Sequence, residues 1–210
     1  MTDSPFRIGF TVQGGGEMKK QLGAWIVLGA LLLGGCAAKQ IDTGDLQRRY
    51  AAMDGYVATV KLTAASRNES VTYVLDVERN GDETRVTVQE PEAIAGVSAV
   101  LSGDALSLTY DGMALSAGGA PTELNAVNAA DVVVRALADG FLTEQNQESF
   151  EGKDALRLCL ETELNGETLH VTVFLDEADA PLYAEIERGG EIVQYLEFTD
   201  FVFGAIVEPE

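Results

Sequence analysis

Short segments in which apolar and polar residues alternate are the feature that most constrains the fold of this chain. The first such segment holds Tyr56, Ala58, Val60 and Leu62 at every second position. Because side chains along a β-strand point alternately to its two faces, this pattern predicts a strand with one buried face. Similar segments recur up to about residue 203, so the sequence favours a β-rich domain.

Tight turn signals separate the alternating segments. Asn80-Gly81, Asp111-Gly112 and Asn165-Gly166 each stand between two predicted strands, and these dipeptides are typical of two-residue β-hairpins. Because nearly every strand joins its successor in this way, we expect one antiparallel sheet of about ten short strands. They are expected near residues 56–63, 71–77, 86–88, 97–101, 106–110, 113–115, 145–150, 155–163, 169–175, 183–188 and 192–203.

Two helices interrupt the strand pattern. The first is expected from about Gly44 to Met53, capped by Asp42 or Thr43. The second is expected near residues 129–139, capped by Asn125 or Asn128 and ended by Gly140. One helix that leads into an antiparallel sheet and one inserted midway indicate an α+β fold, and no linker divides residues 45–205.

The N-terminal region has the layout of a secretory signal. Lys19 and Lys20 follow Met18, an apolar run covers residues 22–33, and the run ends in Leu33-Gly34-Gly35-Cys36. A positive segment, an apolar segment and small residues at the cleavage point define such a signal. The run is far shorter than the ~20 apolar residues of a membrane-spanning helix.

Residues 33–36 resemble the lipobox of bacterial lipoproteins, in which a large apolar residue and two small ones precede a modified cysteine. The resemblance implies that residues 18–35 are a signal peptide, that cleavage falls between Gly35 and Cys36, and that Cys36 carries a diacylglyceryl group. Residues 36–44 would then be a lipidated tether on the outer side of the cytoplasmic membrane. The alternative is an ordinary signal peptide with an incidental cysteine.

Residues 1–17 stand upstream of this complete signal and match none of its parts. The run from Gly14 to Glu17 needs codons rich in G and A, as a translated ribosome-binding site would supply. We therefore expect translation to start at Met18 and residues 1–17 to be a mis-annotated extension. N-terminal sequencing of the unprocessed precursor checks this, and a precursor that contains Thr2 would contradict it.

The charge of the chain restricts its partners. The chain holds 34 acidic and 14 basic residues; without residues 1–35 it holds 32 and 11, a formal charge near −21. Nucleic acid is not expected as a partner, because phosphate binding needs clustered Lys and Arg. Anionic lipid headgroups would also repel the domain, so membrane attachment is expected to come from the lipid on Cys36.

The residues that most often carry catalysis are sparse. His170 is the single histidine, on an expected strand and at its surface. With Cys36 lipidated, Cys159 has no disulfide partner and is expected to be a half-buried strand residue. No phosphate-binding glycine loop or nucleophile elbow is present after residue 35. We therefore expect a non-catalytic protein, although the many carboxylates leave paired-acid chemistry open.

No metal or other cofactor is expected. A His-based metal site lacks partners for His170. The acidic segment 76–82 weakly resembles a calcium loop, but Thr87 stands where a bidentate Glu is required. This segment is better interpreted as a hairpin with solvated acids.

The order of elements resembles the LolA/LolB-like lipoprotein-carrier fold over about Asp42 to Phe203. The features that carry the resemblance are the helix before Gly55, the break at Pro91 ahead of the hairpins at 103–115, and the helix near 129–139. It implies a half barrel, a curved antiparallel sheet with two helices packed at its concave face. Relatives carry lipid or sense envelope stress, which implies sequestration of an acyl chain or a lipidated peptide.

No ligand residue can be transferred from that family by motif, and one departure concerns the cavity. No Trp follows residue 35, and the apolar residues are mostly Val, Leu and Ala. A smaller or filled cavity is consistent with this composition. The candidate apolar pocket consists of strand and helix positions that could face the helices: Tyr56, Val60, Leu62, Tyr73, Leu75, Leu106, Leu108, Tyr110, Val133 and Leu137.

Two functions follow from these expectations. The first is a membrane-anchored, extracytoplasmic lipoprotein that binds a lipid or another apolar ligand in envelope lipid handling or sensing. The alternative is an anchored protein-interaction module of the cell envelope, with a filled core and no ligand, in which the ten candidate residues are packed core.

Overall fold

A computed structural model describes residues 42–65 and 69–204, which belong to one compact unit spanning Asp42–Glu210. The predictions for residues 1–17, for the signal peptide 18–35 and for cleavage and lipidation at Gly35 and Cys36 lie outside the described residues. None of the helices in the described part is both long and apolar enough to cross a membrane.

The described residues form one antiparallel sheet of eleven strands in the order β6-β5-β4-β3-β2-β1-β11-β10-β9-β8-β7. Pairing of the first strand with the last, β1 with β11, joins two runs of hairpins into a single sheet. This leaves β6 and β7 at the two edges. The strands are β1 (Gly55–Ala65), β2 (Ser70–Asn80), β3 (Glu83–Glu90), β4 (Ser98–Ser102), β5 (Ala105–Tyr110), β6 (Met113–Gly119), β7 (Phe141–Phe150), β8 (Lys153–Leu164), β9 (Glu167–Leu175), β10 (Pro181–Arg188) and β11 (Glu191–Phe203).

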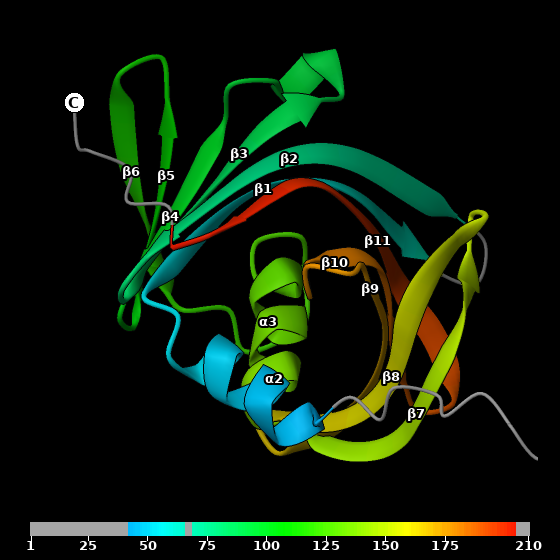
Figure 1. Ribbon diagram of the computed structural model, residues 1–210. Coiled ribbons are helices and arrows are strands. Elements are labelled where there is room, and N and C mark those ends of the chain that lie inside the picture. Colours follow the sequence, from blue (N-terminus) through cyan, green and yellow to red (C-terminus); the bar gives the residue numbers. More distant parts are fainter. Residues whose placement is uncertain (1–41, 66–68, 205–210) are drawn as a thin grey trace, which may run out of the picture. The chain divides into compact units, whose positions relative to one another are not determined.

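The sheet is curved, and both helices lie on its concave side. Figure 1 shows β1, β11 and β8–β10 bending around α2 (Thr43–Ala51) and α3 (Ala129–Asp139), while β3–β6 extend away from the helices. A 3₁₀ turn, η1 (Glu92–Ile94), follows Pro91 and precedes β4. The predicted α+β half barrel with two helices at its concave face is confirmed.

The turn residues determine where the strands reverse. Asp111 and Gly112 have φ of 49° and 73°, and Asn165 and Gly166 have φ of 51° and 81°. Positive φ at both central residues defines the type I′ turn, whose twist matches that of the strands it joins. The hairpins β5–β6 and β8–β9 therefore form at the dipeptides that the sequence indicated.

The helix starts follow the expected capping residues. Asp42 is the N-cap of α2, and its side chain accepts a hydrogen bond of 3.0 Å from the Gly44 N–H. Asn128 occupies the N-cap position of α3, where its side chain accepts from the N–H of Asn125 at 2.9 Å instead of capping the helix. Helix α2 ends at Ala51, two residues before the predicted end.

Helix α3 is buried on nearly every side and supplies the core of the concave face. Its buried residues are Ala129, Ala130, Val132, Val133, Val134, Ala136 and Leu137. A helix with so wide an apolar surface packs against more than one neighbour, and its charged residues Asp131, Arg135 and Asp139 share one stripe. Burial of each Val or Leu side chain stabilises the fold by about 1.5–3 kcal/mol.

One carboxylate connects α3 to three strands. Asp131, in the first turn of α3, accepts hydrogen bonds of 2.7 Å from the Tyr56 hydroxyl of β1 and from the Thr84 hydroxyl of β3. Its Oδ1 lies 3.4 Å from Nη1 of Arg79 on β2. An anion at a helix N-terminus is also favoured by the helix dipole. Burial, followed by the Asp131 charge, raises the pKa of Tyr56 well above the usual tyrosine value.

We predict that Asp131→Ala lowers the free energy of unfolding by about 2–4 kcal/mol, because it leaves two buried hydroxyl groups and a guanidinium without their acceptor. Urea unfolding followed by circular dichroism measures the change. Asp139→Ala, at the exposed end of the same helix, is the matched control and should stay within about 0.5 kcal/mol of the parent. Equal unfolding midpoints for the two variants would contradict the role of Asp131.

Candidate functional site

The strand register shows which side chains point toward the helices. Residues directly opposite each other in an antiparallel pair share a face. Tyr56 and Thr84 face α3, because both bond to Asp131. From Val86, two residues along β3 from Thr84, the cross-strand pairs run through Ala99 and Leu108 to Leu115. Leu108 of β5 and Leu115 of β6 therefore lie on the concave face.

The eight strand residues of the predicted pocket all share this concave face, because Leu62 pairs with Tyr73, Val60 with Leu75, and β5 continues the register. Six of the ten predicted residues are at most 2% exposed, and in this structure they are packed core: Tyr56, Val60, Leu62, Leu75, Val133 and Leu137. Tyr73 and Leu106 are half-buried. A role for these residues in binding a ligand stays a prediction.

The concave face of β5 and β6 is uncovered by the described residues. Leu108 is 38% exposed, Tyr110 54%, Met113 65% and Leu115 70%. These four residues and Leu106 form what we call the open apolar face. It exists because α2 and α3 lie against the other part of the curved sheet, as Figure 1 shows.

A hollow of about 430 Å³ lies beside the open apolar face, between α2, α3 and the loop at residues 120–121. We call it the α2–α3 hollow. Leu101 of β4 lines it and pairs directly with Leu106 of β5. The hollow and the open apolar face are therefore neighbours on one surface. Its apolar lining residues are Ala51, Met53, Leu101, Ala120, Pro121, Val132, Val134, Ala138 and Leu164.

Polar groups at the wall of the α2–α3 hollow are mostly paired with protein. Arg79 and Asp131 form their ion pair there. The hydroxyl of Tyr50 donates a 2.6 Å hydrogen bond to the Asp179 carbonyl. Nη2 of Arg135 donates to the Glu163 carbonyl at 3.0 Å, whereas its buried Nε has no protein partner within the described residues. The wall thus offers polar and apolar surface in about equal measure, with most of the polar groups held by protein partners.

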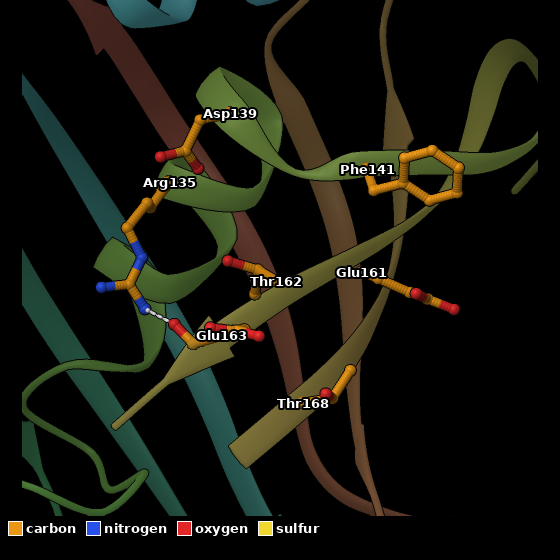
Figure 2. Close-up of a pocket in the computed structure, with 7 residues that line it drawn as sticks. All are labelled: Arg135, Asp139, Phe141, Glu161, Thr162, Glu163 and Thr168. Carbon is orange, nitrogen blue, oxygen red and sulfur yellow. Dashed lines mark hydrogen bonds between the residues drawn. The ribbon is translucent and has the colours of Figure 1, made fainter. Parts of the chain in front are cut away.

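A second hollow of about 400 Å³ lies on the other side of Arg135. Figure 2 shows Arg135 reaching from α3 to the carbonyl of Glu163, with Asp139, Phe141, Glu161, Thr162 and Thr168 around it. Three carboxylates and one guanidinium line this hollow, so its chemistry does not suit an apolar ligand. None of the ten predicted pocket residues lines either hollow.

Four residues of these surfaces were not among the site residues predicted from the sequence: Leu101, Met113, Leu115 and Arg135. Met113 and Leu115 continue the alternation of β5, so the hairpin at Asp111-Gly112 was a usable signal for them. The broad apolar part of α3, interrupted only by Asp131, Arg135 and Asp139, was a signal that this helix packs on more than one side. Leu101 and Arg135 have no such local signal.

The two residues considered for reactivity lie where they were expected. His170 is a surface residue of β9, and its Nδ1 lies 3.6 Å from a carboxylate oxygen of Glu161. Cys159 is a free, half-buried residue of β8. Across residues 42–65 and 69–204, no group of three or more His, Cys, Asp and Glu side chains is placed to hold a metal ion.

Burial of Tyr50 and Tyr56 gives an expected dependence of stability on pH. Burial, with the nearby Asp179 charge second, raises the pKa of Tyr50 above the usual 10.0, and the pKa of Tyr56 is also raised. Above pH 10 the unfolded chain loses these protons while the native protein keeps them. Stability is therefore retained below pH 10 and falls above it, by up to about 1.4 kcal/mol per pH unit for each tyrosine.

Urea unfolding at a series of pH values checks this expectation. Tyr183 also has a raised pKa, chiefly through burial, so it adds to the same decline. Tyr50→Phe removes one of these titrating groups, so the decline above pH 10 should be shallower in this variant than in the parent. Equal slopes for the parent and the variant would contradict the assignment to Tyr50.

Comparison with known proteins gives likeness in structure only. No protein-family model matches the chain, and no curated protein matches it in sequence. Similar solved structures include a LolA superfamily protein from Nitrosomonas europaea, with 13% identity and a TM-score of 0.48 over 79% of this chain and 93% of that one. The lipoprotein LppX from Mycobacterium tuberculosis aligns with 14% identity and a TM-score of 0.43, over 80% of this chain and 99% of that one.

The MucA/MucB complex from Pseudomonas aeruginosa contains a chain that aligns with 14% identity and a TM-score of 0.43, over 80% of this chain and 59% of that one. All three alignments have TM-scores below 0.5. The half-barrel architecture therefore rests on the strand order and register of the chain itself.

Proposed function

We propose that this protein is a membrane-anchored, extracytoplasmic lipoprotein that binds a lipid or another apolar ligand without catalysis. The ligand site is the open apolar face together with the α2–α3 hollow. One observation carries the proposal: large apolar side chains on one face of the β5–β6 hairpin are 38–70% exposed.

Adjacent exposed apolar side chains are uncommon on monomeric soluble domains and mark binding surfaces. The hollow next to them, at about 430 Å³, falls within the range of roughly 300–1,000 Å³ that is usual for small-molecule sites. Leu101, which lines the hollow, pairs with Leu106 of the open apolar face. Leu108 is two residues further along β5 and lies on the same face. An elongated apolar ligand could lie along this path with one end in the hollow.

The anchor supports the same function. A diacylglyceryl group on Cys36 would hold the domain beside acyl chains, and two chains suffice for stable attachment. We predict that Cys36→Ser moves the protein from the membrane fraction to the soluble fraction of its bacterial host. Cys159→Ser, which changes the second cysteine after residue 35, is the control and should stay with the membrane. Membrane retention of Cys36→Ser would contradict the anchor.

A second function is favoured by the packing of the core. Six of the ten predicted pocket residues are buried between sheet and helix, as a protein-interaction module with a filled core would require. In that case the open apolar face would contact a protein. The two functions differ in whether a small apolar molecule binds to the purified domain.

Native mass spectrometry of residues 37–210, purified without detergent, tests the ligand function. We predict an added mass that organic extraction releases as lipid, or one gained after incubation with envelope lipids. A domain without added mass under both conditions would contradict lipid binding and leave the interaction module.

A matched pair of variants locates the ligand. Leu115→Asp should weaken binding of the released lipid about tenfold or more, because it places a charge within the apolar contact. Val202→Asp is the control. Val202 is 53% exposed and pairs with Val57, which follows Tyr56 on β1 and therefore points to the opposite face of the sheet. Equal losses in the two variants would argue against a site on the concave face.

A further inference from the structure

The edge strand β6 carries neither the charges nor the Pro that normally protect a sheet edge; its register with β5 is regular from Met113 to Ser116 and shifts beyond Ser116. Its sequence from Met113 to Gly119 contains no charged residue and no Pro, and every one of its residues is exposed. Native edge strands usually carry charges, Pro or bulges that prevent another strand from pairing with them. At the opposite edge, β7 carries Glu144 and Glu148, which form ion pairs with Arg157.

Backbone groups of β6 are available for pairing. In a two-residue hairpin the pair next to the turn, here Tyr110 with Met113, is hydrogen-bonded, and such pairs alternate with non-hydrogen-bonded ones. Ala114 and Ser116 then belong to the non-hydrogen-bonded pairs, so their N–H and C=O groups point outward from the sheet. Within the described residues, β6 has a neighbouring strand on one side only.

Acidic residues stand at both ends of this edge. Asp111 lies in the turn just before β6, and the carbonyl of Asp104 accepts a 2.8 Å hydrogen bond from Ala120, just after β6. Residues 86–134 contain six acidic residues and no Lys or Arg. The turns before and after β5 thus each hold one acidic residue, and no base in this stretch offsets their charge.

These observations select among the molecules that could occupy the edge. A second copy of the chain would bring its own Asp104 and Asp111 to the same two ends, where like charges repel. A segment with basic residues at its ends would instead meet opposite charge. Alternate apolar residues in that segment would extend the apolar surface of Met113 and Leu115, which lie on the concave face.

We propose that β6 is a docking edge for an extended segment of a basic protein, which adds a twelfth strand to the sheet. The segment is about six or seven residues long, to match β6. It alternates apolar with polar residues and has Lys or Arg near each end. This site uses the backbone of β6, and it is therefore distinct from the apolar ligand site on the concave face.

The probe for this site is a fluorescent heptapeptide in which valine alternates with threonine and a lysine stands at each end. Its binding to residues 37–210 is measured by anisotropy at low salt. A peptide with glutamate at each end is the comparison, and it should bind about tenfold more weakly, with the difference lost as salt rises. Failure of the lysine peptide to bind, or equal binding of the two peptides, would overturn the proposal.

Ser116→Pro tests the edge directly, because it removes an outward N–H and spares the pairing with β5. It should weaken peptide binding about tenfold, whereas Ser116→Ala, which keeps the N–H, should bind like the parent. The double change Asp104→Asn and Asp111→Asn should weaken binding without changing the backbone edge. This second variant keeps the proposal testable if Ser116→Pro does not fold. Unchanged binding in the folded variants would overturn the proposal.

Other occupants of the edge have distinct outcomes. A dimer in sedimentation that Ser116→Pro dissociates would assign the edge to a second copy and overturn the proposal. Peptide binding that appears only after deletion of residues 205–210 would assign the edge to the protein's own C-terminal segment, and would equally overturn it. Native mass spectrometry on the same samples reports lipid separately, so loss of peptide binding and loss of the lipid ligand are distinguishable.

Discussion

Contact between α3 and one part of the curved sheet is the interaction on which the rest of the structure depends. A curved sheet exposes its concave face unless another element covers it. Asp131 connects the first turn of α3 to β1, β2 and β3 through Tyr56, Arg79 and Thr84. Because a half-buried carboxylate is stabilised where donors satisfy it, this contact places the helix at one position along the sheet. The apolar residues beneath it become core.

The same placement creates the candidate site. Beyond β3 the concave face continues through Ala99 and Leu108 to Leu115, while exposure increases toward the edge. One hairpin, β5–β6, thus carries both an uncovered apolar face and an uncharged edge. The face suits an apolar ligand and the edge suits an extended basic segment. Binding at either would bury surface that the described residues leave open.

Much of the fold could be predicted because its signals are local. Alternation defined the strands, and Asp111-Gly112 and Asn165-Gly166 marked hairpin turns, since φ > 0 at both turn residues favours Asn, Asp and Gly. At the predicted Asn80-Gly81 turn, Asn80 pairs with Glu83, so the central residues are Gly81 and Asp82, one position later than predicted. The strand parity also placed all eight predicted pocket residues of the strands on one face. These eight residues nonetheless differ in burial: Val60 is buried, whereas Tyr110 is 54% exposed. Strand parity specifies a face and carries no information about what covers it.

The sequence by itself determined the strands, their turns, the antiparallel order within each run of hairpins, and the face on which each apolar side chain lies. The expected signal peptide and the lipobox-like residues before Cys36 are local patterns too, and they stay predictions. Only the tertiary structure decided which apolar positions are core and which form a surface. That division depends on where residues 129–139 pack against strands that begin more than seventy residues earlier in the chain, at Gly55. It depends equally on the pairing of β1 with β11, which leaves β6 and β7 as the edges. Contacts between such distant segments could not be predicted, because no local sequence pattern indicates them.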